Sequence, residues 1–339
     1  MKSEEKSMAV FKSIMANFAS FIMAIVLTVI PYAGFELPVI DTAEENCLMT
    51  AELISDTHLE ETEILRPLFL TVGLKNLQRA KTDIDAVVIA GDITNYADEA
   101  FLARHYEIFT KHSPAVAITA AGNHNIGHVG DRDVTNITRE EAKANFIRYN
   151  NEYLGIEATD NYYSYEVEGY TFIVLGDEVI DGGHWDGMDI SEAQLAFLDS
   201  ELARATADGK PAFVVCHWTV DGMNGQEIVY PDSVIELYKN DVKSVMEKYE
   251  NVFYISGHIH GGIKSEAAAD FVGFANVEQE NGVTYVSLPT YGIVNSFGNP
   301  VSATGMQMEV YADKVMFRPR NFLTNKWFTN AAYTIELVG

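Results

Sequence analysis

The chain has little cysteine and little positive charge, and each shortage excludes a class of protein. Only two cysteines, Cys47 and Cys216, occur among 339 residues, which is too few for a disulfide framework. Lysine and arginine number 23 against 49 aspartate and glutamate residues, for a formal net charge of -26. No basic run interrupts this acidity, so a polyanion such as nucleic acid is repelled at long range. The charge is otherwise expected to be a solvated acidic surface.

Several sequence patterns are also missing. Neither His-Glu-x-x-His nor His-x-His-x-Asp-His occurs, which argues against the metallohydrolases that bind metal through such strings. There is no internal repeat, low-complexity segment or Pro/Ser-rich linker. A chain of this length could form one large domain or two smaller ones, and the lack of a linker favours one catalytic domain over residues 48–339.

Between Lys12 and Glu36 lie 23 residues without a charged side chain. As a helix this stretch would extend roughly 30 Å, enough to cross a bilayer. Residues 1–35 are therefore predicted to be a signal peptide or membrane anchor, with a polar linker at 36–47. The lysines ahead of the stretch favour an orientation that places the remainder outside the cytoplasm. The protein is thus predicted to be secreted or membrane-anchored, and cleavage of the segment stays open.

Apolar runs alternate with helix-like segments as far as residue 263. The strand-like runs are 53–54, 86–90, 116–118, 213–215 and 252–255. The helix-like segments are 61–80, 97–111, one opened by a capping box of Thr138 and Glu141, one opened by Ser191 and Gln194, and 234–249. This order predicts an α/β layered fold. Short strands are predicted at 283–287, 306–311, 314–318 and 333–337, where they would extend the same sheets.

Five polar motifs each follow one of the buried strand-like runs. They are Asp56-Thr57-His58, Gly91-Asp92, Gly122-Asn123-His124, the single His217, and Gly257-His258-Ile259-His260. Any one of these histidines alone would more often be a surface or core residue. Together, carboxylate, imidazole and carboxamide ligands suit Zn, Fe or Mn better than Ca or Mg, which prefer oxygen ligands. Two divalent ions would outweigh the two carboxylates, so the motifs predict a cationic two-metal hydrolase site that attracts phosphate.

This ordered motif set resembles the calcineurin-like metallophosphoesterase family, from about residue 51 to 263. The resemblance implies a four-layer α-β-β-α sandwich and two divalent transition-metal ions (Mn, Fe or Zn). It also implies hydrolysis of a phosphate mono- or diester by a metal-bridging hydroxide, with His124 assisting the leaving group. By motif, the ligands would be Asp56, His58 and His260 for the first ion, Asn123, His217 and His258 for the second, and Asp92 for both.

One position departs from the family pattern. The family usually follows the histidine at 124 with Asp or Glu, which orients and charges the ring, whereas Asn125 follows here. Asparagine stabilises an imidazolium less well, which leaves the strength of His124 as an acid open. Asn125 is also the only support for an alternative, a membrane-tethered metal-containing binding protein with little or no turnover. The purple acid phosphatase branch is not expected, because its tyrosine ligand would fall at Asn95.

The substrate side of the site is less determined by sequence. His128 and His184 lie in Gly-rich segments and are predicted substrate contacts, although simple turn chemistry explains such segments too. His105 and His112 are predicted to lie on the surface of a helix. The expected substrate is a small phosphate ester, possibly a nucleotide, because the motif set is similar to the cyclic-nucleotide phosphodiesterase branch. Phosphodiesterase, phosphomonoesterase and protein phosphatase activities remain open.

Overall fold

The computed structural model describes residues 43–60, 64–79, 83–126, 137–180, 187–229, 239–263, 276–292 and 303–339. Nearly all of the predicted N-terminal segment and linker therefore lies outside the described residues. Within the described ranges, every helix is too short or too polar to cross a bilayer.

The first sheet combines strands from both ends of the chain. Its strands are β1 (Met49–Ile54), β2 (Ala86–Ile89), β3 (Val116–Thr119), β10 (Thr304–Val310), β11 (Lys314–Asn321), β12 (Lys326–Trp327) and β13 (Tyr333–Glu336). The spatial order is β12-β11-β10-β1-β2-β3, and β13 pairs with β11. The first three strands run parallel to one another, whereas β10 pairs antiparallel with β1. The predicted C-terminal strands thus extend the sheet that β1 begins.

The second sheet has the order β4-β5-β6-β7-β9-β8. Its strands are β4 (Tyr163–Val167), β5 (Tyr170–Val174), β6 (Ala212–Val215), β7 (Val252–Gly261), β8 (Val277–Glu280) and β9 (Val283–Pro289). The four central strands, from β5 to β9, are parallel. The sequence prediction missed β4, β5 and β8.

The five predicted helices are present, together with three short helices that were not predicted. The predicted helices are α2 (Leu65–Leu77), α3 (Glu99–His112), α5 (Arg139–Leu154), α6 (Glu192–Ala205) and α8 (Lys239–Met246). The short ones are α4 (Asn123–Ile126), α7 (Gln226–Val229) and the 3-10 helix η3 (Thr329–Ala331). The capping box of Thr138 and Glu141 is confirmed at the start of α5. At α6 only half of the predicted box forms, because the Gln194 side chain turns to the main chain of Gly176 instead.

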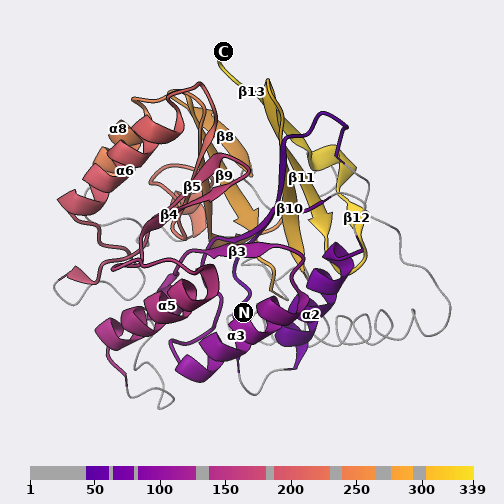
Figure 1. The fold of residues 1–339 in the computed structure, drawn as a ribbon, viewed down its shortest axis with the longest axis vertical. Helices are drawn as coiled ribbons and strands as arrows, with labels where there is room; N and C mark the ends of the chain where they lie inside the picture. Colours follow the sequence, from indigo (N-terminus) through magenta and orange to yellow (C-terminus); the bar gives the residue numbers. More distant parts are fainter. Residues whose placement is uncertain are drawn as a thin grey trace, which may run out of the picture.

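Three apolar cores lie between the layers of helices and sheets. One core lies between the sheets and includes Leu53 of β1 and Phe213 of β6. A second joins the first sheet to α2, α3 and α5, and a third joins the second sheet to α6 and α8. Figure 1 shows α6 and α8 at the upper left and α2, α3 and α5 in the lower part. The mixed α/β fold with two sheets is therefore confirmed.

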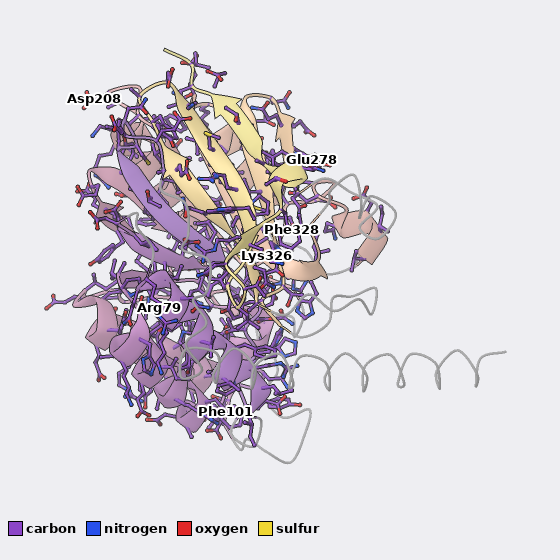
Figure 2. All side chains as sticks on the ribbon, turned by 90° about the vertical axis from the view of Figure 1, so that its right-hand side faces the viewer. Arg79, Phe101, Asp208, Glu278, Lys326 and Phe328 are labelled. Atoms are coloured by element: carbon purple, nitrogen blue, oxygen red, sulfur yellow. The ribbon has the colours of Figure 1, made fainter. Side chains whose placement is uncertain are left out.

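Strands β12 and β13 both pair with β11 and complete the first sheet at the end opposite β3. Figure 2 looks onto this end, where Lys326 of β12 and Phe328 lie at the surface. In β11, which pairs with β12, Arg320 is fully buried and forms an ion pair of 2.9 Å with the equally buried Glu52 of β1. This ion pair connects β11, near the C-terminus, to β1, the strand that precedes Asp56.

Candidate metal centre

Parallel pairing brings the first two motifs together as their strands end. The segments that follow β1 and β2 continue side by side. The main-chain N–H of Asp56 donates to Gly91 O (3.1 Å), and that of His58 donates to Asp92 O (2.9 Å). A third contact crosses between the sheets, where His217 Nδ1 lies 2.8 Å from Ala90 O. Since a carbonyl only accepts, Nδ1 of His217 carries the proton and Nε2 points into the site as an acceptor.

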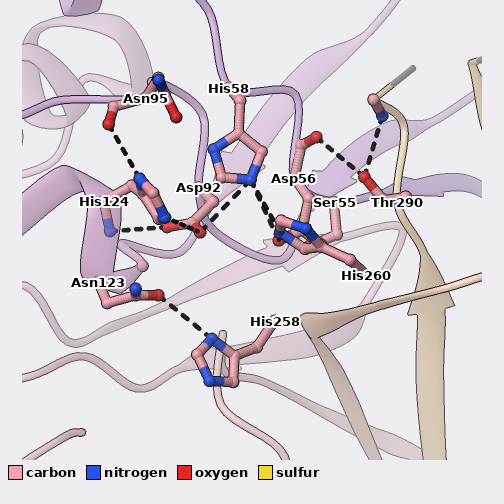
Figure 3. A network of polar contacts seen from close by, with 12 residues as sticks. Ser55, Asp56, His58, Asp92, Asn95, Asn123, His124, His258, His260 and Thr290 are labelled. Carbon is pink, nitrogen blue, oxygen red and sulfur yellow. Dashed lines mark hydrogen bonds and ion pairs between the residues drawn. The ribbon is translucent and has the colours of Figure 1, made fainter. Parts of the chain in front are cut away.

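The first group of converging side chains consists of Asp56, His58, Asp92 and His260. Their ligand atoms all lie within 4.8 Å of one another. His260 Nε2 is 3.0 Å from Asp56 Oδ1 and 2.9 Å from His58 Nε2. Figure 3 shows these rings and carboxylates pointing toward a common centre.

The second group lies on the other side of Asp92. Asn123 Oδ1 is 3.1 Å from His217 Nε2 and 3.2 Å from His258 Nδ1, and these two nitrogens are 3.2 Å apart. His217 Nε2 is also 3.2 Å from Asp92 Oδ2. The same oxygen lies 3.7 Å from His58 Nε2 in the first group, so Asp92 Oδ2 belongs to both groups. Its other oxygen accepts the main-chain N–H of His124 at 3.0 Å, which fixes the carboxylate.

These distances fit two metal ions. Nitrogen and oxygen ligands about 2.1 Å from one ion lie about 3 Å apart when their bonds are at right angles, close to the separations in both groups. The Asp56 carboxylate is fully buried, yet neither oxygen accepts a hydrogen bond among the described residues. A buried carboxylate needs a cation beside it, which either a metal ion or a protonated His260, with Nε2 3.0 Å from Oδ1, can supply. The mixed imidazole and oxygen donors suit Zn, Fe or Mn.

Two motif glycines allow this close packing. A Cβ atom on Gly122 would lie 2.7 Å from the Asp92 amide nitrogen and 2.2 Å from its Oδ1. A Cβ on Gly91 would lie 2.6 Å from Cβ of His217, and Gly91 also has a φ of +86°. Both positions therefore require glycine for steric reasons.

Five of the seven predicted ligands have left-handed backbone conformations. The φ angles are 58° at Asp56, 46° at His58, 49° at Asp92, 68° at His258 and 51° at His260. The last two lie within the irregular end of β7 rather than beyond it. Such conformations are uncommon for residues with side chains and concentrate at functional sites.

The protonation states are set by burial and by the neighbouring charges. Burial lowers the pKa of His58 and His258 well below the ordinary value, and adjacent histidines lower it further. Burial also lowers the pKa of His217 and His260, but Asp92 and Asp56 respectively outweigh this and raise it. Burial raises the pKa of Asp92, but the histidines around it hold the pKa well below its usual range. The Asp92 carboxylate therefore stays ionised, and protons on His217 and His260 compete with metal ions for the ligand set.

His124 lies beside the two groups rather than within them. Its Nε2 is 4.0 Å from Asp92 Oδ2, and its Nδ1 is 2.9 Å from the main-chain oxygen of Asn95. This carbonyl places the proton on Nδ1 and directs Nε2 toward Asp92. The side chains of His124 and of the predicted ligand His260 keep 22% and 25% of their surface exposed, while the remaining six predicted ligands are nearly fully buried. The centre is therefore open on the side of these two rings.

Asn125 does not act on the neighbouring ring as the family pattern implied. Its Oδ1 accepts the main-chain N–H groups of Gly122 (2.9 Å) and Ile93 (3.4 Å), and its Nδ2 donates to Thr94 Oγ1 (2.8 Å). Asn125 thus joins the two loops that carry Asp92 and Asn123. The alternative of a protein with little or no turnover rested on the missing carboxylate at position 125, and it stays a prediction.

The remaining histidines have different outcomes. His128 and His184 lie outside the described residues. His105 was predicted on a helix surface, and this is wrong: its side chain is fully buried on α3 against Phe109, with ring centroids 4.7 Å apart. His112, at the end of the same helix, is partly exposed.

Sequence reasoning missed the groups that orient the predicted residues. The carbonyls of Ala90 and Asn95 fix the tautomers of His217 and His124. Thr290, which follows β9, donates to the Asp56 carbonyl at 3.4 Å. Main-chain carbonyls leave no signal in a sequence, because every residue has one.

The comparisons with known proteins agree with this geometry. A family model described as calcineurin-like phosphoesterase matches residues 52–262. No curated protein matches the chain. A dimetal phosphatase from Danio rerio is similar over 86% of this chain and 100% of its own, with 15% sequence identity and a TM-score of 0.60. Purple acid phosphatase PPD1 from yellow lupin (Lupinus luteus) seeds covers 85% of this chain and 53% of its own, with 14% identity and a TM-score of 0.55. The structure of PhoD is similar over 88% of this chain and 70% of its own, with 12% sequence identity and a TM-score of 0.53. At these identities the likeness to solved structures shows the fold alone.

Proposed function

The chain belongs to the calcineurin-like phosphoesterase family, and from this premise we propose that it hydrolyses a small phosphate ester. The observation that carries the proposal is the shared carboxylate oxygen Asp92 Oδ2, which lies 3.2 Å from His217 Nε2 and 3.7 Å from His58 Nε2. A single oxygen between two ligand groups is the arrangement that a pair of metal ions needs. The three apolar cores support the four-layer α-β-β-α sandwich expected of the family.

Two ions would be held by the seven predicted ligands. The first set is Asp56, His58 and His260, the second is Asn123, His217 and His258, and Asp92 belongs to both. When bound, the ions supply Lewis-acid stabilisation of developing negative charge and lower the pKa of water at the site. The chain itself supplies the two carboxylates that limit the repulsion between the cations.

His124 would act on the leaving group. With its Nδ1 proton donated to Asn95 O, Nε2 is the nitrogen that faces Asp92 and the open side of the centre. In its protonated form Nε2 can donate to the leaving oxygen of the ester, which is general acid catalysis. His260 borders the same open side, so the ester would enter between these two rings.

The acidic surface favours a small substrate over a polyanion. A net charge of -26 repels nucleic acid at long range, whereas a phosphate mono- or diester, a nucleotide included, interacts mainly with the local cationic centre. We further propose that residues 1–35 place the enzyme outside the cytoplasm, either secreted or held at the membrane. Cell fractionation of the full chain tests this location, and recovery only from the cytoplasm would contradict it.

Activity is tested on the full chain after removal of metal and reconstitution with Mn, Fe or Zn. Elemental analysis should give about two ions per chain, and a panel of phosphate mono- and diesters should reveal turnover. His124→Ala should lower turnover by about 10²- to 10⁴-fold while both ions are retained. His112→Ala, on the partly exposed end of α3, is the matched control and should change neither property. Absence of hydrolysis with every metal would contradict the proposed function, and loss of metal in the His124 variant would make that residue a ligand.

A further inference from the structure

Glu60 lies two residues beyond His58 and outside every motif, yet it forms a dense set of contacts. Its Oε1 accepts a hydrogen bond from Asn95 Nδ2 and lies 3.4 Å from Arg66 Nη1. Its main-chain oxygen accepts from Arg104 Nη1 at 3.1 Å. The Glu60 side chain is 27% exposed. One arginine and one amide thus hold its carboxylate, and a second arginine holds its main chain.

Asn95 connects this carboxylate to His124. The Asn95 amide nitrogen donates to Leu59 O at 3.0 Å, its side chain donates to Glu60, and its carbonyl oxygen lies 2.9 Å from His124 Nδ1. Figure 3 shows this carbonyl directed at the His124 ring. Asn95 therefore binds Glu60 through its side chain and accepts from the His124 ring through its main-chain carbonyl.

The segment around Asn95 has little regular structure to fix that carbonyl, since the isolated bridge between Leu59 and Thr94 ends just before it. Residues 95–98 form bends and irregular chain between the end of β2 and the start of α3. In a helix or a strand, the main-chain ladder would determine the direction of the carbonyl. Here the side-chain bond to Glu60 supplies the constraint, together with the amide bond to Leu59.

We propose that Glu60 is a positioning residue for His124. By holding Asn95 it keeps the Asn95 carbonyl in place to accept the Nδ1 proton, and Nε2 is then the nitrogen presented to the leaving oxygen. When the His124 ring is protonated, both nitrogens carry a proton, so Nδ1–H donates to Asn95 O and Nε2–H can donate to the leaving oxygen. After that transfer the neutral ring keeps its remaining proton on Nδ1. The inference rests on the proposed function, since it assigns a role at the same site.

The decisive experiment compares Glu60→Ala in the wild-type and His124→Ala backgrounds. In the metal-reconstituted full chain, Glu60→Ala should lower kcat about 10- to 100-fold on an ester with a poor leaving group, because small misplacements of catalytic groups have effects of this size. KM and the content of two ions should remain unchanged, and an activated ester should be affected less. In the His124→Ala background the same change should cause no further loss, because both residues act through one step.

Two variants serve as controls. Glu60→Gln keeps an oxygen that accepts from Asn95 and should retain most of the activity. Glu99→Ala removes an exposed carboxylate of α3 that pairs with Arg148, and it should leave kcat unchanged. An equal loss from Glu60→Ala in both backgrounds, or on both esters, would assign Glu60 a merely structural role and overturn the inference.

A second readout does not depend on turnover. The ¹⁵N chemical shifts of the His124 ring report which nitrogen carries the proton. The wild type should show the proton on Nδ1, and Glu60→Ala should show a mixture of both tautomers. An unchanged tautomer in this variant would overturn the role of Glu60. If no ester is hydrolysed, the proposed function fails, and the chemical shifts still decide whether Glu60 positions the ring.

Discussion

Replacement of His105 by leucine should make the protein more resistant to acid. The imidazole is fully buried on α3 between the rings of Tyr106 and Phe109. Neither ring nitrogen has a hydrogen-bond partner among the described residues. A buried polar group without a partner costs about 1–3 kcal/mol, and leucine is apolar and of similar volume. At pH 7 the variant should therefore be at least as stable as the wild type.

The effect should grow as the pH falls. Burial lowers the pKa of His105 from 6.5 to about 3 in the folded protein. The unfolded chain takes up this proton at its ordinary pKa, so unfolding is favoured progressively as the pH falls from 6.5 toward 3. One pH unit corresponds to 1.36 kcal/mol. At pH 5 the histidine should thus cost about 2 kcal/mol of unfolding free energy, which the leucine variant does not lose.

Urea unfolding of both proteins at pH 7 and pH 5, at equal metal concentration, measures this difference. The histidines of the metal centre also titrate, but they are common to both proteins and cancel in the comparison. His112→Leu, on the partly exposed end of the same helix, is the control and should change the pH dependence far less. An equal loss of stability by wild type and His105→Leu between the two pH values would refute the reasoning.

Three further predictions concern the centre and its support. Asp92→Ala should lose both ions, whereas His58→Ala should lose one, because Asp92 Oδ2 is shared; elemental analysis tests this, and two ions in the Asp92 variant would contradict it. Gly122→Ala should destabilise the protein by about 1–3 kcal/mol and weaken metal binding, because its Cβ would press on the Asp92 main chain; unchanged thermal unfolding and metal affinity would argue against this. Arg320→Met should cost about 3–5 kcal/mol by leaving the buried Glu52 without its partner. Adding Glu52→Leu should recover most of that loss in urea unfolding, and a further loss would show that the ion pair is not the cause.

The motifs made much of the centre predictable. Each follows an apolar run, and the carboxyl ends of neighbouring parallel strands meet at one edge of a sheet. Asp56 and Asp92 therefore had to lie close together once β1 and β2 paired in parallel. The second sheet brings His217 and His258 from β6 and β7 by the same rule. That the two sheets face each other was inferred from the family resemblance rather than from any residue pattern.

Some features were missed although the sequence contained their signal. On α3 the buried residues are Phe101, Leu102, His105, Tyr106 and Phe109, a spacing that places position 105 in the apolar stripe of the helix. His105 was predicted at the surface because histidine is polar. Its position in the apolar stripe correctly indicated that it is buried. Likewise Glu168 and Gly169, with φ angles of 50° and 75°, form the two-residue turn between β4 and β5, a connection typical of hairpins.

Other features had no signal to find. The acceptors that orient His124 and His217 are main-chain carbonyls, and their direction depends on the complete fold. Glu60 resembles any other surface glutamate until Asn95 is placed beside it. The contacts of Asn125 with Gly122 and Thr94 had no signal in the sequence either, because neighbours in sequence need not be neighbours in contact.

The left-handed ligands link the metal centre to the stability of the whole fold. Each such residue costs of order 1–3 kcal/mol and persists only where the surrounding structure determines it. Five of them lie at the ends of β1, β2 and β7, which are buried strands paired in parallel. The main-chain contacts of the paired strands thus help to hold these ligands in their conformations. Conversely, an ion that binds only the folded protein stabilises it by mass action, and it does so where the backbone conformation is least favourable. The strands therefore help to fix the ligand geometry, and bound ions would offset the strain that this geometry imposes.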